Sequence, residues 1–150
     1  HSSKVMDIHG ANMNNNGGLI LYYAHGGNSQ RFYIWKVSSE YYIIKAKHSG
    51  KVLTAINDNS NVQIVQYDYQ PNNNYQLWSK EYTGEGEWWY IKNKGSRMVL
   101  AVKDKKMADF TKIIQRSKYP DENFEWAFVE VVYDKTLPNM LWLNLHNAYL

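Results

Sequence analysis

Apolar and polar residues alternate in short segments along most of this chain, and stretches rich in Asn, Gly, Ser and Asp separate these segments. Aromatic and β-branched residues are frequent in four of them, namely Tyr41 to Lys45, Val52 to Ile56, Val62 to Tyr67 and Leu77 to Tyr82. Such segments, bounded by turn-forming residues, are typical of β-strands. We find no segment of helical length with apolar residues at a 3.6-residue spacing. The pattern therefore predicts an all-β protein.

The sequence repeats at an offset of 47 residues, which brings HSSKVMDI (1–8) onto HSGKVLTA (48–55) and then onto GSRMVLAV (95–102). Each copy closes with an aromatic residue, Phe32, Trp78 or Trp126. Three units with about four strands each are too few for a propeller and favour a β-trefoil, in which the closing aromatics share one core. We expect a single domain with repeats at 1–40, 41–87 and 88–133 and a tail at 134–150.

The tail of the chain has the pattern of a strand that opens a repeat. His1 corresponds to His48, so the first strand of repeat one is missing at the N-terminus, whereas Leu141, Leu143 and Leu145 alternate with polar or aromatic residues near the C-terminus. We expect this tail to pair beside residues 4 to 8 and to complete repeat one, in a register that the sequence leaves open. The alternative is that residues 141 to 150 begin another trefoil of a tandem array.

Composition narrows the class of protein further. The chain has 150 residues with 15% aromatic residues and no cysteine, and its mean hydropathy is -0.61. The longest apolar run, Leu19 to Ala24, is too short for a transmembrane segment. The first residues carry no apolar signal segment, which indicates a mature, excised or tagged chain. The scattered histidines lack the spacing of metal ligands, and we expect no metal and no cofactor.

Charge is modest overall but uneven along the chain. The formal net charge is +3, yet nine Lys or Arg residues lie between Lys92 and Lys118 against only Asp104 and Asp109. Such a basic stretch could attract phosphates, anionic sugars or headgroups. It lacks the aromatic interleaving and the motifs of nucleic-acid-binding proteins, so we expect no nucleic-acid partner, and a solvated charged face is the simpler interpretation.

No motif indicates an enzyme. The acidic residues Glu81, Glu85 and Glu87 lie beside Trp88 and Trp89, a combination also found in glycosidases, but they fall on an expected hairpin rather than in a cleft. Nucleophile-elbow, phosphate-loop and dinucleotide-binding patterns are all missing from the sequence. We therefore expect no catalytic residue.

The closing tripeptides Gln30-Arg-Phe32, Gln76-Leu-Trp78 and Phe124-Glu-Trp126, in phase with the repeat, carry a family resemblance. The chain resembles the Gln-x-Trp repeat of the ricin B-chain type of β-trefoil lectin over nearly its whole length, and is similar to the domains attached to bacillar and clostridial toxins and haemagglutinins. The resemblance implies a secreted, extracellular bacterial module that binds galactose- or N-acetylgalactosamine-type glycans on cell surfaces. It also implies a toxin-like parent or a toxin partner subunit.

The same resemblance implies a sugar site in repeat one. Asp7 stands at the position of the carboxylate that accepts hydrogen bonds from sugar hydroxyls, Tyr22 at that of the aromatic platform, and His25, Asn28 and Gln30 lie in the turn that completes the site. A pyranose presents both C–H groups and hydroxyls, so a flat ring beside a few fixed polar groups suits it. Alternation along the strand allows either Tyr22 or Tyr23 to face outward, and its spacing from Gln30 favours Tyr22.

The other two repeats depart from this pattern. Repeat two keeps Tyr67, Asn74 and Gln76 as a weak second sugar site, but Thr54 replaces the carboxylate. Repeat three has Ala101, Arg116 and Phe124 at the carboxylate, platform and glutamine positions, which predicts a purely structural role.

Two other functions stay open. In one, the chain is a protein- or membrane-interaction trefoil with vestigial sugar sites, and its basic stretch binds the partner. In the other, it is the targeting module of a glycosidase or protease.

Overall fold

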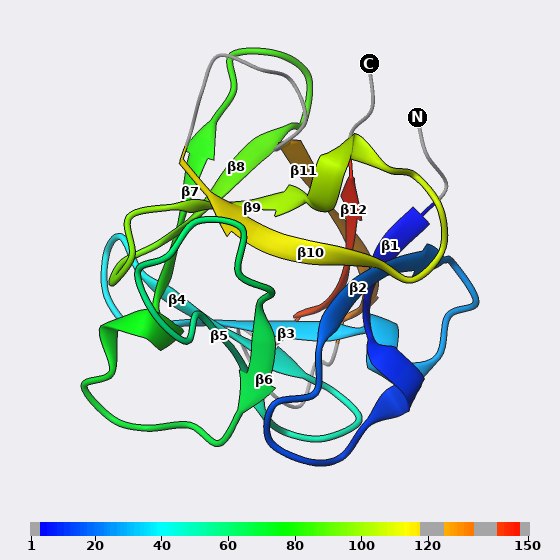
Figure 1. Cartoon of the computed structure of the whole chain (residues 1–150), viewed down its shortest axis with the longest axis horizontal. Coiled ribbons are helices and arrows are strands. Elements are labelled where there is room, and N and C mark those ends of the chain that lie inside the picture. The colour runs from blue at the N-terminus through cyan, green and yellow to red at the C-terminus, as the bar shows by residue number, and fades with distance from the viewer. Residues whose placement is uncertain (1–3, 118–124, 134–140, 148–150) are drawn as a thin grey trace.

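The structure, a computed structural model, describes residues 4–117, 125–133 and 141–147. Its strands are β1 (Lys4–Ile8), β2 (Leu19–Tyr23), β3 (Phe32–Lys36), β4 (Tyr42–Ala46), β5 (Val52–Thr54), β6 (Val65–Tyr67), β7 (Trp78–Tyr82), β8 (Trp89–Asn93), β9 (Val99–Val102), β10 (Thr111–Arg116), β11 (Glu125–Tyr133) and β12 (Leu141–Asn147) (Figure 1). Short 3-10 turns lie at η1 (His9–Ala11), η2 (Asn28–Gln30), η3 (Asn74–Gln76) and η4 (Lys103–Lys105).

Half of the strands form a closed barrel. Antiparallel pairing runs from β3 to β4, β7, β8, β11, β12 and back to β3. A closed ring leaves no unpaired sheet edge, so every barrel strand has neighbours on both sides.

The remaining strands form three hairpins related by the same pattern. The hairpins β1–β2, β5–β6 and β9–β10 are joined to barrel strands β12, β4 and β8, respectively. Their registers correspond as well, because Asp7 pairs with Ile20 where Thr54 pairs with Val65. Three equivalent units around one barrel make a β-trefoil, and the fold predicted from the repeat is confirmed.

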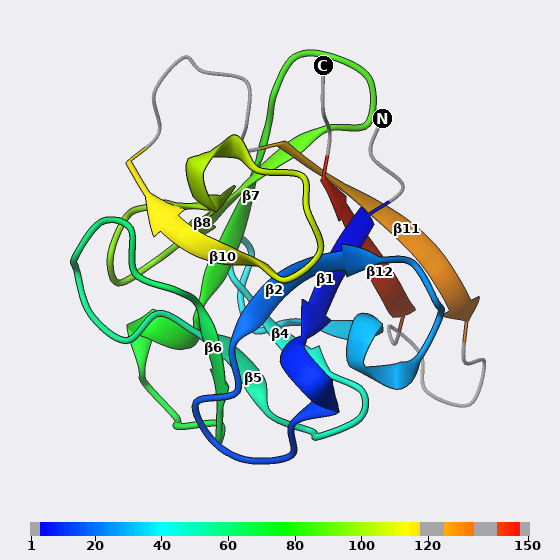
Figure 2. The same ribbon diagram turned by 45° about the vertical axis from the view of Figure 1, so that its right-hand side comes forward.

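The tail closes the barrel as expected. β12 pairs with β11 and β3 in the barrel and with β1 through Val5 and His146, so the first and last strands lie side by side (Figure 2). The register that the sequence left open is thereby defined. Strand limits differ little from the prediction, although β5 and β6 are shorter than the apolar segments that contain them.

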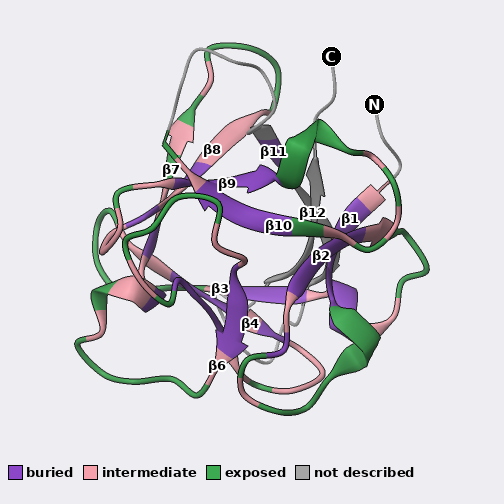
Figure 3. Ribbon diagram, in the orientation of Figure 1, coloured by how far each residue is buried: buried purple, intermediate pink, exposed green. Residues whose placement is uncertain are grey.

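One hydrophobic core fills the interior, and its residues come from all three units (Figure 3). Phe32, Trp78 and Trp126 are all at most 1% exposed and belong to the same cluster, which confirms that the closing aromatics converge. The indole N–H groups of Trp78 and Trp126 donate to the carbonyl oxygens of Leu53 and Leu100. A Trp-to-Ala change in such a core costs about 3–5 kcal/mol.

Buried glutamine side chains hydrogen-bond to the loops of neighbouring units, and we call each of these arrangements a glutamine clamp. Gln66 Nε2 donates to the carbonyl oxygens of Asn12 (2.6 Å) and Asn14 (2.8 Å) in the loop after β1. Gln115 makes the same pair of hydrogen bonds to the loop after β5. Leu21 occupies the corresponding place on β2 and is a core residue. The β9–β10 loop therefore lacks this clamp, and its Met107 packs against the core instead.

Candidate functional site

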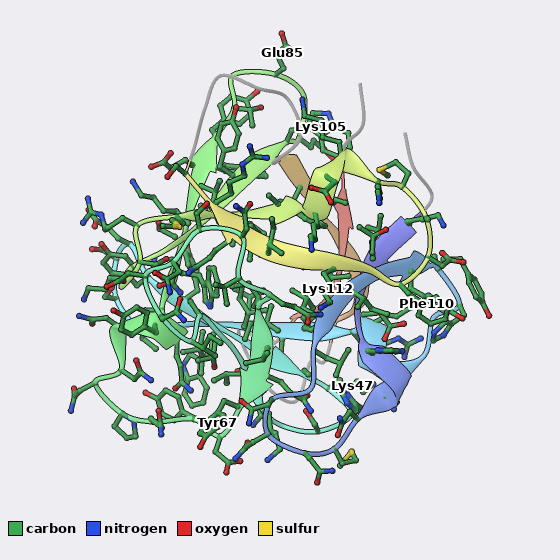
Figure 4. All side chains as sticks on the ribbon, viewed as in Figure 1. Lys47, Tyr67, Glu85, Lys105, Phe110 and Lys112 are labelled. Atoms are coloured by element: carbon green, nitrogen blue, oxygen red, sulfur yellow. The ribbon has the colours of Figure 1, made fainter. Side chains whose placement is uncertain are left out.

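A pocket of about 290 Å³ opens beside the β1–β2 hairpin. Its lining residues come from β1, η1, β2, the turn between β2 and η2, η2 itself and the loop before β10: Asp7, His9, Gly10, Ala11, Ile20, Tyr22, His25, Ser29 and Phe110. Figure 4 shows Phe110 at the edge of the molecule beside β2. The pocket thus contains the carboxylate and the platform that the sequence placed in repeat one, at Asp7 and Tyr22.

Asp7 is buried at the base of this pocket, with a side chain only 6% exposed. Its Oδ2 accepts hydrogen bonds from Gln30 Nε2 (2.9 Å) and lies 3.2 Å from His25 Nε2. Within the described part of the chain, Oδ1 accepts no hydrogen bond. One oxygen therefore fixes the carboxylate, and the other is free to accept from a ligand.

Gln30 is fully buried and holds the turn around the pocket together. Its Nε2 also donates to the carbonyl oxygen of Tyr23 (2.8 Å), and its Oε1 accepts from the backbone N–H groups of His25 (2.9 Å) and Gly26 (3.1 Å). A buried polar side chain with this many partners positions its neighbours rigidly. Gln30 acts on the pocket through Asp7 and the turn, because it does not line the pocket itself.

The ring of His25 is oriented by both of its nitrogens. Nδ1 accepts from the Gly27 N–H at 3.0 Å, which leaves Nε2 to carry the proton toward Asp7. The contact needs a glycine, because a Cβ at position 27 would lie 2.7 Å from His25 Cε1. The two hydrogen bonds together select the Nε2–H tautomer of the neutral ring.

Tyr22 forms the aromatic wall of the pocket. It is half-buried and lines the pocket, whereas Tyr23 is 50% exposed and does not. The Tyr22 ring meets the His25 ring edge-on, with centroids 5.9 Å apart. Loss of hydration raises the pKa of the Tyr22 phenol above its ordinary value of 10.0.

The sequence did not predict that a residue of unit three, Phe110, also lines this pocket. Phe110 precedes β10, and its ring lies 4.9 Å from that of Tyr22 and 5.3 Å from that of His9. Pairing of β10 with β2 brings it there, since Thr111 faces Leu21. The available signal was an aromatic residue at a turn position where the other two repeats have Asn16 and Asn61.

Two neighbouring turn residues occupy different places. Asn28 is exposed and does not line the pocket, whereas Ser29 is 6% exposed and lines it. Among the described residues, the Ser29 hydroxyl has no hydrogen-bond partner. Ser29 is thus the second polar group, after Asp7 Oδ1, that is free to meet a ligand there.

The second predicted site is built differently. Gln76 Nε2 donates to Thr54 Oγ1 (3.2 Å) and to the carbonyl oxygen of Asp68 (2.9 Å), the same arrangement that Gln30 has without the carboxylate. Tyr75 stands where unit one has Ser29, and its hydroxyl donates to Asp58 Oδ1 at 2.8 Å. In unit two, the hydrogen-bonded pair of Tyr75 and Asp58 therefore occupies positions whose counterparts line the pocket in unit one.

The other members of this second site differ in burial. Asn74 is exposed and Tyr67 is half-buried, and Figure 4 shows Tyr67 in a different part of the molecule from Phe110. In unit three, Ala101 is buried in β9 and Arg116 ends β10, while Phe124 lies outside the described residues. The structure thus gathers a carboxylate and a platform into one pocket in unit one.

Part of the basic stretch flanks β9. Before β9, four cations line a second pocket of about 440 Å³ together with the carboxylates of Glu40 and Glu81: Lys92, Lys94 and Arg97 of the stretch, and Lys80 of β7. Three of these cations have partners, since Lys80 lies over Trp89, Lys94 over Tyr41, and Lys92 near Glu81. After β9, Lys103, Lys105 and Lys106 are exposed around η4.

Neither a metal-binding cluster nor a membrane-spanning helix is present among the described residues. No group of three or more His, Asp or Glu side chains there is arranged to hold a metal ion. Across the same residues, we find no helix with the length and apolarity that crossing a membrane requires.

Comparison with protein families gives a match over most of the chain. The family model described as "Ricin-type beta-trefoil lectin domain-like" matches residues 1–55 and 28–116. None of the curated proteins compared with this chain matches it.

Solved structures share the fold. The chain superposes on a designed 3-fold symmetric protein, ThreeFoil, with a TM-score of 0.81 and 26% identity over 87% of this chain and 94% of that one. A mosquitocidal holotoxin gives a TM-score of 0.75 at 18% identity over 85% of this chain and 16% of the holotoxin. The C-half of an earthworm R-type lectin, solved with GalNAc, gives 0.62 at 18% identity over 97% and 91%.

Proposed function

We propose that this chain, which belongs to the ricin-type β-trefoil lectin domain-like family, is a non-catalytic module that binds carbohydrate in the pocket of unit one. That pocket holds a free carboxylate oxygen beside an aromatic ring. Asp7, Tyr22 and His25 are the proposed core of the sugar site, with Ser29 as a further hydroxyl partner. Gln30 positions Asp7, and Asn28 contributes only at the rim.

The observation that carries the proposal is the state of Asp7. A buried carboxylate is costly unless it is hydrogen-bonded, and Gln30 and His25 satisfy only Oδ2. The remaining oxygen, in a pocket with the Tyr22 ring, suits a ligand that offers hydroxyl groups next to a C–H face. A pyranose has both.

Galactose- or N-acetylgalactosamine-type sugars are the proposed ligands. The choice follows the family resemblance, and the earthworm R-type lectin that shares the fold was solved with GalNAc. We expect one shallow site of this kind to bind with a Kd of about 1 mM, equivalent to about 4 kcal/mol. Useful attachment to cells would then come from several copies on a larger, extracellular, toxin-like protein or its partner subunit.

Retention on immobilised galactose and GalNAc, together with a glycan array, tests this function. Asn at position 7 can still accept from Gln30 and His25 but presents an amide N–H₂ to the ligand, so Asp7→Asn should abolish retention while the melting temperature stays close to that of the wild type. Asp68→Asn, which changes an exposed carboxylate next to Tyr67, is the matched control and should bind normally. A folded Asp7→Asn protein that binds as well as the wild type would overturn the site.

The pocket before β9 supports a second candidate, a protein- or membrane-interaction domain that binds an anionic partner. Four cations and two carboxylates line that pocket, so its excess charge is positive. Ionic strength separates the two functions: binding to a neutral sugar should hardly change between moderate and high salt, whereas binding through lysines should weaken steeply. Lys94→Ala with Arg97→Ala should impair only the salt-sensitive binding.

A further inference from the structure

Phe110 occupies a backbone conformation that the other two units give to asparagine. The φ angles of Asn16, Asn61 and Phe110 are 70°, 65° and 67°, all in the left-handed region. Their backbone N–H groups donate to Gln66, Gln115 and Leu21, respectively, each at 2.9 Å, so the three positions are equivalent. Asn tolerates this conformation, whereas a bulky aromatic residue is a clear outlier there.

Phe110 also gains little from burial, because it is 55% exposed. Strain of this kind persists only where the surroundings enforce it, and it collects at binding sites. The surroundings do enforce it here: Thr111 Oγ1 donates to the carbonyl oxygen of Ala108 (2.7 Å), and Lys4 on β1 pairs with Asp109. The ring is therefore held in place at the surface by bonds on both sides of it.

The equivalent residues lie beside equivalent platforms of the next unit. The backbone N–H groups of Asn16, Asn61 and Phe110 donate to the residues that immediately precede Tyr67, Arg116 and Tyr22, respectively. Of these three pairs, only that of Phe110 and Tyr22 consists of two aromatic residues. Tyr22 belongs to unit one, whose carboxylate position holds Asp7. An unfavourable, exposed phenylalanine thus coincides with the proposed sugar pocket.

Geometry indicates how the two rings are used. The centroids of Tyr22 and Phe110 are 4.9 Å apart at an interplanar angle of 54°, so the rings touch and no sugar ring fits between them. They form instead one bent apolar surface along the wall of the pocket, and much of the Phe110 ring stays exposed to solvent. A sugar on Tyr22 and Asp7 would leave Phe110 open to the next residue of the glycan.

We propose that Phe110, contributed by unit three, is a second saccharide subsite, and that the ligand of this pocket is a disaccharide or a longer glycan whose terminal residue binds at Asp7 and whose neighbouring residue packs on Phe110. This inference rests on the proposed function. The ring provides a C–H contact without hydrogen-bond donors of its own, so it selects for the presence of a second residue more than for its hydroxyl pattern.

The test measures affinities for galactose and for a set of galactosyl disaccharides that differ in linkage, lactose among them, by titration calorimetry or ligand-observed NMR. The wild type should bind at least one disaccharide about fivefold more tightly than galactose. In Phe110→Asn, the residue that the other units use, this preference should disappear, because the affinity for the disaccharide falls by more than the affinity for galactose. Phe110→Tyr should retain the preference, and Phe110→Asn should melt no lower than the wild type.

Each other outcome has a definite meaning. An unchanged disaccharide preference in Phe110→Asn, or an equal loss for galactose and disaccharides, would overturn the second subsite and leave the lectin function standing. If the wild type binds neither galactose nor any disaccharide, the proposed function fails, and the subsite fails with it.

Discussion

Gln30 Nε2 lies 2.9 Å from Asp7 Oδ2 and joins the carboxylate of β1 to the turn after β2. The same amide nitrogen bonds the carbonyl oxygen of Tyr23, and the amide oxygen accepts two backbone N–H groups. A residue that does not line the pocket therefore fixes the position of the carboxylate that does.

Replacing this glutamine should affect both stability and binding. Gln30→Leu leaves a buried carboxylate oxygen and two backbone N–H groups with fewer partners, which should lower the free energy of unfolding by about 3 kcal/mol. Gln76→Leu removes the equivalent bonds around Thr54 and should cost a similar amount. Urea unfolding measures both, and only Gln30→Leu should weaken sugar binding. Equal losses of sugar affinity in Gln30→Leu and Gln76→Leu would contradict the assignment of the sugar site to unit one.

The adjacent glycines should respond differently to the same substitution. In Gly27→Ala, the new Cβ meets the His25 ring, which is near the surface and can swing away, so stability should change little while sugar affinity falls about fivefold to tenfold. In Gly26→Ala, the Cβ enters open space at a φ of 75°, so stability should fall by about 1 kcal/mol with unchanged affinity. Calorimetric binding and thermal unfolding of both variants check this; the reverse pattern would argue against a role of His25.

The glutamine clamps should differ in strength. Gln66 donates to two loop carbonyls and also accepts from Ser49 Oγ at 2.7 Å, whereas Gln115 Oε1 is buried with no partner among the described atoms. Gln66→Leu should therefore cost about 2 kcal/mol and Gln115→Leu about 1 kcal/mol. Chemical denaturation gives the order, and a larger loss for Gln115→Leu would show that the clamp is not the dominant interaction.

Titration of Tyr75 offers a test of the hydrogen bond between Tyr75 and Asp58 in unit two. Its hydrogen bond to Asp58 raises the pKa of the phenol above 10.0, because the neutral hydroxyl is the donor. The folded state thus holds this proton more tightly than the unfolded state does. The stabilisation is complete below pH 10 and is lost as the pH rises through the folded-state pKa.

NMR of ¹³Cζ-labelled tyrosine follows this group directly. Tyr75 should titrate later than an exposed tyrosine in the wild type, and Asp58→Asn should bring its pKa back toward the ordinary value. If the substitution leaves the titration of Tyr75 unmoved, the Asp58 contact does not exist in solution.

The fold was predictable because its determinants recur locally. The 47-residue repeat and the closing aromatics Phe32, Trp78 and Trp126 specify three units and one core, and alternation in the tail indicates its missing strand. Strand lengths were less predictable, since the apolar segment from Val62 contributes only Val65–Tyr67 to a ladder, while Gln63 forms an isolated bridge to Ile114.

The site was predictable only within one repeat. The family resemblance implied that Asp7 and Tyr22 share a site, and the structure puts both in one pocket, although their role in sugar binding stays a prediction. Phe110 is distant in sequence and reaches this pocket through the pairing of β10 with β2, which no local pattern encodes. The exchange of Asn28 for Ser29 as a lining residue likewise depends on how the 3-10 turn η2 orients each residue.

The pairing of β1 with β12 has a consequence for the order of events during folding. β1 has a neighbouring strand on both sides only after Val5 pairs with His146. Closing a loop of that length carries a large entropic cost and slows folding. Asp7 lies two residues further along the same strand. A nascent chain on the ribosome therefore should not form the pocket beside Asp7 gradually, unit by unit, but in one late step after β12 has emerged.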